Sequence, residues 1–161
     1  QRSSATPWGA WTSTTPVKHP KDQPKKDMVA IMAAHRIPYT ATATVAYPED
    51  LIAKVRKANS IRGSKFLHVL APCPSGWKTE SNQTVYLSRL AVETCIFPLY
   101  EVEHGEDYRI TVWPKQKQPV EKYLRLQGRF AHLKPDAIAQ IQENVDLEWN
   151  KLVKKAGGGP C

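Results

Sequence analysis

The sequence predicts an α/β protein with a mostly parallel sheet flanked by helices, because strand-like and helix-like segments alternate along the chain. Segment 39–47, YTATATVAY, alternates and is rich in β-branched residues, as strands are. Segment 48–60, PEDLIAKVRKANS, follows with proline in its first turn, acidic residues at its start and basic residues near its end, which indicates a helix. Segment 65–72, KFLHVLAP, is a continuous apolar run, typical of a strand buried on both faces of a parallel sheet.

The segments around this unit predict a loop and two further helices. Residues 1–24 are rich in Ser, Thr, Pro and Trp without a period, so we expect an extended loop. Asp27 is placed to cap a helix that Pro38 ends. Segment 81–95 is amphipathic and predicts the second helix. The side chains expected to face inward are Met28, Ile31 and Met32 in the first helix, and Val85, Leu87, Leu90 and Ala91 in the second.

The last third of the sequence predicts a β-hairpin followed by C-terminal helices. Segments 96–103 and 108–114 are strand-like and flank the turn HGED, which favours an antiparallel pair. Segments 120–130 and 136–156 have helical patterns, and the second has an apolar stripe expected to comprise Ile138, Ile141, Val145, Leu147, Trp149 and Leu152. We therefore divide the chain into a loop at 1–26, an α/β core at 27–114, C-terminal helices at 115–156 and a tail at 157–161.

The basic charge of the chain permits several interpretations. Lys and Arg number 23 against 15 Asp and Glu, a formal net charge of +8, and most of the basic residues lie at helical spacing or in loops. Solvated helix faces or a docking surface for an acidic partner protein are both compatible with this pattern. A nucleic-acid-binding domain fits the charge, but the sequence has no recognition motif, so we expect no nucleic acid partner. The sequence has no run of about 18 apolar residues and no signal peptide, so we expect a soluble, cytoplasmic protein without a membrane partner.

Residue chemistry alone gives one candidate ligand and no catalytic residue. Cys73 follows the apolar strand and lies between two prolines that restrict the local backbone, so its thiolate could bind a metal or cluster; the alternative is a buried, inert cysteine. Cys95 is expected in the core, and Cys161 lies in the tail. The five histidines show no metal-ligand spacing, and we expect His68 to be a core or interface histidine. No nucleophile or phosphate-binding motif is present, so no complete active site is expected.

Several longer motifs, in the same order, resemble one enzyme family. They are QRSSATPWGAWTSTTP at the start, AAHRIPYTATATVAYPEDL, KFLHVLAPCPSGW, RLAVETCIFPLYEVEHG and the LKPDAI start of the last helix. Together they resemble the thiamine-diphosphate-binding beta subunit of pyruvate:ferredoxin oxidoreductase, also called pyruvate synthase, within the 2-oxoacid:ferredoxin oxidoreductases. The resemblance runs from Gln1 to about Lys155, and it implies that the chain is the C-terminal part of such a subunit.

This resemblance implies cofactors and partners that the residues alone do not. The family oxidatively decarboxylates pyruvate to acetyl-CoA and CO2 with thiamine diphosphate, Mg and coenzyme A, and passes electrons through [4Fe–4S] clusters to ferredoxin. By resemblance Cys73 is the fourth ligand of one cluster, whose other three cysteines are not in this sequence. The GDG and DNxxYxNTG segments of the metal and diphosphate site are also absent from it. The residues expected to lie beside the cofactor pocket are Gln1, Ser3, Ser4, Thr6 and Pro7.

The resemblance leaves two functional hypotheses open. In the first, the chain is an incomplete part of the oxidoreductase, inactive alone and assembled with the other subunits. In the second, it is a non-catalytic half-chain that docks on a partner subunit and completes the site in trans. The sequence does not distinguish pyruvate from another 2-oxoacid as the substrate.

Overall fold

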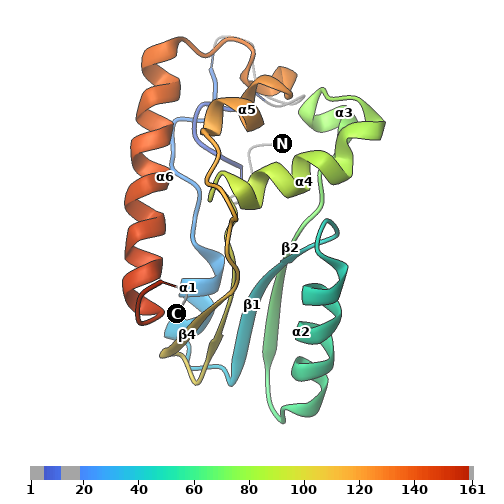
Figure 1. The fold of residues 1–161 in the computed structure, drawn as a ribbon, viewed down its shortest axis with the longest axis vertical. Coiled ribbons are helices and arrows are strands. Elements are labelled where there is room, and N and C mark those ends of the chain that lie inside the picture. The colour runs from blue at the N-terminus through green and yellow to red at the C-terminus, as the bar shows by residue number, and fades with distance from the viewer. Residues whose placement is uncertain (1–5, 12–18, 160–161) are drawn as a thin grey trace.

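The computed structural model describes residues 6–11 and 19–159, and these form one mixed sheet with helices on both faces and at one end (Figure 1). In Figure 1, α6 runs along one side, α2 lies on the other, and α3, α4 and α5 gather beyond one end of the sheet. In chain order the elements are α1 Met28–Ala34, β1 Tyr39–Thr44, α2 Pro48–Ser60, β2 Lys65–Leu70, α3 Pro74–Trp77, the 3-10 turn η1 Ser81–Gln83, α4 Thr84–Glu93, β3 Leu99–Glu103, β4 Asp107–Val112, α5 Val120–Arg125, the 3-10 turn η2 Gly128–Phe130 and α6 Pro135–Lys155.

The four strands run in the order β2-β1-β3-β4. β1 and β2 are parallel, with Tyr39 opposite Lys65 and Thr44 opposite Leu70, whereas β1/β3 and β3/β4 are antiparallel. The α/β class, the hairpin and the C-terminal helices are confirmed, but the sheet is mixed rather than mostly parallel. The hairpin is the reason: His104 and Gly105 have φ of 54° and 81°, and this tight turn returns the chain as β4 without a crossover helix.

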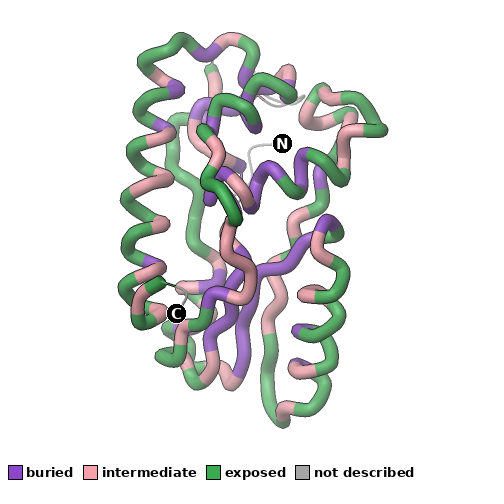
Figure 2. The backbone as a smooth tube through the Cα atoms, viewed as in Figure 1, coloured by how far each residue is buried: buried purple, intermediate pink, exposed green. Residues whose placement is uncertain are grey.

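β2 is an edge strand, so the prediction that it is buried on both faces is wrong. All six residues of β1 are buried, while in β2 Lys65 and Val69 are exposed and the other four are half-buried (Figure 2). The crossover helix α2 lies over β1 and the hairpin rather than over β2. Buried Lys54 fixes it there, because its ammonium donates hydrogen bonds to the Thr42 carbonyl at 2.8 Å and to the Thr111 hydroxyl at 2.8 Å.

A second anchor of α2 is the Glu101 cluster, which comprises Tyr39, Lys57, Glu101, Glu103 and Arg109. The Glu101 carboxylate is only 2% exposed and accepts hydrogen bonds from the Tyr39 hydroxyl at 2.7 Å, from the Lys57 ammonium at 2.8 Å and from the Arg109 guanidinium. Burial alone would raise the pKa of Glu101, but these three donors outweigh it, and the pKa lies below its usual range. The cluster therefore stabilises the packing of α2 on the sheet.

Three residues that were predicted to lie in the core are exposed in the structure. Ile31, Val85 and Leu147 are 39%, 52% and 52% exposed. At 100° per residue, Ile31 and Leu147 lie on the side of their helices opposite the buried residues, which are Val29 and Ala33 in α1 and Ile138, Ile141 and Leu152 in α6. Val85 shares its face with buried Val92, and it is exposed because it lies in the first turn of α4. The larger core lies where α4, α5 and α6 meet, beyond the end of the sheet.

Candidate functional site

Cys73 lies just beyond the carboxyl end of β2, where the chain turns into the single-turn helix α3. Its thiol is exposed and caps this helix, since the Gly76 N–H donates to the Cys73 Sγ at 3.4 Å. The Cys73 carbonyl also accepts a hydrogen bond from the Trp77 N–H at 2.8 Å. The alternative of a buried, inert cysteine is therefore wrong, and the sulfur is presented at a strand end by a fixed turn.

The turn that carries Cys73 packs against η2, 50 residues or more further along the chain. The Gly128 N–H donates to the Lys78 carbonyl at 3.0 Å, and a Cβ at Gly128 would come within 2.7 Å of the Lys78 Cβ. The Trp77 ring lies 3.8 Å from the guanidinium carbon of Arg129, a cation–π distance. This close approach requires glycine at position 128 and holds α3 in place from its C-terminal side.

Arg129 is itself buried, with 5% of its surface exposed. Its Nε donates to the Gln127 Oε1 at 2.9 Å, and the Gln127 Nε2 donates to the Tyr123 carbonyl at 2.6 Å. Burial lowers the pKa of Arg129 to about 10, although the neighbouring Tyr123 hydroxyl acts in the opposite direction. No carboxylate of residues 6–11 or 19–159 forms an ion pair with it.

The segment from Thr6 to Trp11 runs beside residues 19–21 and ends at η2. The Gly9 N–H donates to the Lys21 carbonyl at 2.8 Å, and the Lys21 N–H donates to the Ala10 carbonyl at 3.1 Å. The Trp11 N–H donates to the Arg129 carbonyl at 2.8 Å. Buried Thr6 accepts a hydrogen bond at its carbonyl from the Lys21 ammonium. The segment from Thr6 to Trp11 is thus hydrogen-bonded to η2, the turn that also supports the Cys73 loop.

A cavity of about 690 Å³ opens between the carboxyl ends of β1 and β2, the start of the chain and α6. Thr6 and Pro7, both predicted to lie near a cofactor, line it together with His68, Trp77 and Arg129. Gln1, Ser3 and Ser4, predicted for the same role, lie outside the described residues, as does Cys161. The structure brings two of the predicted residues to one cavity, and Cys73 lies at the base of the helix whose Trp77 lines it.

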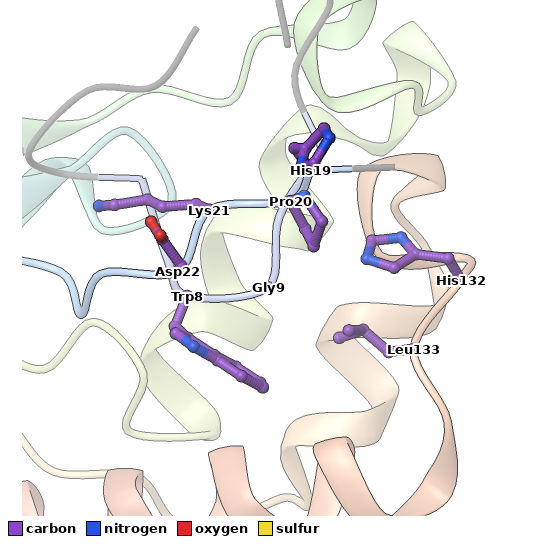
Figure 3. Close-up of a pocket in the computed structure, with 8 residues that line it drawn as sticks. All are labelled: Trp8, Gly9, His19, Pro20, Lys21, Asp22, His132 and Leu133. Carbon is purple, nitrogen blue, oxygen red and sulfur yellow. The ribbon is translucent and has the colours of Figure 1, made fainter. Parts of the chain in front are cut away.

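A smaller cavity of about 440 Å³ lies beside the first segment (Figure 3). Trp8, Gly9 and residues 19–22 form one side of it, and His132 and Leu133 form the other. The His132 ring stacks on Trp11 with 3.7 Å between ring centroids, and burial lowers the pKa of His132. Within the described ranges, neither cavity holds three or more side chains that could bind a metal ion together.

The remaining candidates have structural roles. Cys95 is buried, as predicted, and burial raises the pKa of its thiol to about 11. His68 is half-buried and lies edge-on to Phe97 with 5.3 Å between ring centroids, which agrees with its interpretation as a core histidine; burial lowers its pKa, and Lys25 adds to this effect. In the part of the chain that the structure describes, Cys73 is the exposed cysteine.

The burial of Arg129 was not predicted, because this residue lies in a basic, helix-like segment that was interpreted as a solvated face. That interpretation is wrong for Arg129, and also for Lys21 and Lys54, which are buried. The apolar neighbours Leu124, Leu126 and Phe130 around Gln127, Gly128 and Arg129 are the signal that the segment enters the core.

Comparison with curated proteins finds relatives named as pyruvate synthase and ketoisovalerate oxidoreductase subunits, although no family model matches the chain. The pyruvate synthase subunit PorB of Methanocaldococcus jannaschii is 52% identical over 155 residues, 94% of this chain and 52% of that protein. PorB of Methanothermobacter marburgensis is also 52% identical, over 94% of this chain and 54% of its own length. The ketoisovalerate oxidoreductase subunit VorB of Pyrococcus abyssi is 46% identical over 97% of this chain and 51% of its own length. The chain is homologous to the PorB and VorB subunits.

This homology confirms the resemblance to the beta subunit of a 2-oxoacid:ferredoxin oxidoreductase. The chain spans about half the length of the curated PorB and VorB proteins that it matches. Both names denote subunits of oxidoreductases, so the relatives work in heteromeric assemblies. No helix within 6–11 or 19–159 is long and apolar enough to cross a membrane.

Proposed function

We propose that the chain is part of an oxidoreductase that converts pyruvate and coenzyme A to acetyl-CoA and CO2, or a related 2-oxoacid to the corresponding acyl-CoA and CO2, and passes electrons through [4Fe–4S] clusters to ferredoxin. The observation that carries this proposal is 52% identity to a pyruvate synthase subunit over 94% of the chain. In the assembled enzyme, thiamine diphosphate with Mg supplies the decarboxylation chemistry, and the protein orients the reacting groups.

Cys73 is proposed to supply one cluster ligand. Three features of its geometry support this role: the thiol is exposed, it follows a strand end, and the Gly76 N–H points at its sulfur from 3.4 Å. Backbone N–H donors to cluster sulfurs are among the features that set cluster potentials. Since the described residues contain no group of three metal-ligating side chains, the other ligands of the cluster must come from outside them. Cys73 would therefore be one ligand of a cluster whose remaining ligands lie outside the described residues.

The first segment is proposed to lie beside the thiamine diphosphate pocket without supplying metal ligands. Thr6 and Pro7 line the large cavity, and the hydrogen bond from the Trp11 N–H to the Arg129 carbonyl fixes the path of this segment. Gln1, Ser3 and Ser4 are assigned the same role from the resemblance alone. We propose that the chain acts in the cytoplasm and is inactive until the other subunits complete the site.

The activity is tested in the purified complex that contains this chain. We expect reduction of ferredoxin that depends on both pyruvate and coenzyme A, and slower reduction with 3-methyl-2-oxobutanoate, the keto acid in the name of the VorB relatives. Because no described residue identifies the substrate, a preference for the branched acid would change the substrate and keep the reaction class. Failure of every 2-oxoacid to support ferredoxin reduction by the intact complex would contradict the proposal.

The second candidate is a half-chain that completes a site by docking. It is favoured by the outer edge of β2, which pairs with no other strand of the described residues. This strand is six residues long and apolar apart from Lys65 and His68, and it has neither a bulge nor a proline to prevent further pairing. Val69 on β2 and Ile52 and Val55 on α2 are 43–48% exposed. We propose that the part of a PorB-type subunit that this chain does not match adds a strand here.

A matched pair of variants tests this docking. Val69→Asp should abolish co-purification with the other part of the subunit, whereas Val85→Asp, at an exposed valine on α4, should retain it. Equal co-purification of both variants would exclude the β2 edge as the docking surface. The net charge of +8 further suggests that ferredoxin, as an acidic partner, binds a basic face, in which case ferredoxin reduction should slow as ionic strength rises.

A further inference from the structure

Arg129 is a buried cation without a buried anion. The residue is 5% exposed, and its side-chain contacts in the described part of the chain are the Gln127 amide, the Tyr123 hydroxyl and the rings of Trp77 and Phe130. Neutral partners satisfy hydrogen bonds, but they do not balance the charge. A buried charge is costly unless an opposite charge lies nearby, and most buried ions in proteins are paired or lie beside a metal centre or ligand. We therefore expect an anion near the Arg129 guanidinium, and the described residues do not supply one.

The geometry links this cation to Cys73 through a single side chain. The backbone N–H of Trp77 donates to the Cys73 carbonyl at 2.8 Å, and the Trp77 ring centroid lies 3.8 Å from the guanidinium carbon of Arg129. Trp77 therefore contacts the Cys73 backbone through its own backbone and the Arg129 guanidinium through its ring, so the cation is packed on the helix that begins at Cys73. The protein between them is partly buried and screens charge less than water does.

We propose that Arg129 is a positioning residue that holds the Cys73 loop and balances the negative charge of the iron–sulfur centre bound there. The inference rests on the proposed role of Cys73. A cluster held by thiolates carries a net negative charge that grows on reduction, so a buried cation packed on the helix that begins at Cys73 stabilises the reduced form more than the oxidised form. Arg129 therefore raises the reduction potential of this cluster, and its stacking on Trp77 fixes the turn that presents the ligand.

The test is a potentiometric titration of the clusters in the complete enzyme, followed by electron paramagnetic resonance. Arg129→Met should lower the reduction equilibrium constant of one cluster at least tenfold, which is about 59 mV for a one-electron couple. Arg129→Lys keeps the charge, so its potential should stay within about 15 mV of the wild-type value. Arg125→Met removes an equal charge from an exposed position on α5, where solvent screens it, and should leave every potential unchanged.

Three outcomes separate this inference from the function on which it rests. If Cys73→Ser leaves all clusters intact, the proposed ligand role fails, and the role of Arg129 fails with it. If Cys73→Ser removes a cluster but Arg129→Met leaves every potential unchanged, the inference about Arg129 alone is overturned. If Arg129→Met does not assemble, Arg129→Gln, which removes the charge but keeps hydrogen-bond donors, decides: a tenfold fall in its reduction equilibrium constant would support charge balance, and an unchanged potential would contradict it.

Discussion

The two described cysteines should differ sharply in their reaction with a thiol reagent, because only the thiolate reacts and burial suppresses it. Burial raises the pKa of Cys95 to about 11 from its ordinary value of 9.0. At pH 8 about one Cys95 side chain in a thousand is then a thiolate, against about one in ten in the unfolded chain. The pKa alone therefore slows its reaction about 100-fold, and the need for local opening slows it further.

The assay is the rate of reaction with a chromogenic disulfide reagent at pH 8, with and without guanidinium chloride. A variant with Cys73→Ser and Cys161→Ser reports Cys95, and we expect unfolding to accelerate its reaction by at least 100-fold. A variant with Cys95→Ser and Cys161→Ser reports exposed Cys73, which should react in the native protein within about tenfold of its unfolded rate. Rapid native labelling of Cys95, or protection of Cys73 equal to that of Cys95, would refute the assignment of Cys73 as the accessible ligand.

Three further substitutions test the packing that positions the site. Because the folded-state pKa of Glu101 is lowered, its stabilising effect is present above the unfolded pKa near 4.5 and is lost as pH falls through the folded value. Glu101→Gln should therefore lower the free energy of unfolding in urea by about 2 kcal/mol at pH 7, and this difference from wild type should shrink towards pH 3. A difference that stays constant with pH would count against the Glu101 cluster. Leu90→Ala, at a residue 2% exposed, should cost about 2–5 kcal/mol, and a cost under 1 kcal/mol would show that the α4 packing is wrong. Gly105→Ala places a Cβ 2.6 Å from the Ala33 carbonyl oxygen at a φ of +81°, so it should lower the melting temperature by several degrees, whereas Gly158→Ala, whose Cβ would meet nothing within 4 Å, should lower it less.

Local signals were sufficient to predict most elements of the fold. Segment 48–60 was predicted as a helix and coincides with α2, because proline, acidic and basic residues mark its two ends. Asp27 caps α1 as expected, accepting a hydrogen bond from the Ala30 N–H at 3.0 Å. The errors have geometric causes: Leu147 was included in the apolar stripe of the last helix, although helical geometry places this residue opposite Ile138.

The neighbours of β2 could not be predicted from its own residues. A continuous apolar run indicates a strand that is buried in its working assembly, but it does not say which segment covers the strand. Within the described chain the hairpin occupies the far side of β1 and leaves β2 at the edge. The same apolar run that misled the burial prediction is therefore the main support for a docking surface there.

The environment of the candidate site depends on a contact between distant segments. The position of Cys73 after a strand was evident from the sequence, whereas the packing of Trp77 on Arg129 joins residues 52 positions apart. No local period signals such a pair. The basic residues around Arg129 concealed it further, because lysine and arginine at helical spacing are usually solvated.

The most direct test of the account is the iron and acid-labile sulfide content of the complete enzyme carrying Cys73→Ser, with Cys95→Ser as the matched control at the buried cysteine. Both variants should retain the other subunits. We expect the Cys73→Ser enzyme to lose or alter one [4Fe–4S] cluster, and with it the paramagnetic signal of that cluster and the reduction of ferredoxin. The Cys95→Ser enzyme should keep the wild-type iron and sulfide content. A Cys73→Ser enzyme with its full complement of clusters and an unchanged spectrum would contradict the central claim.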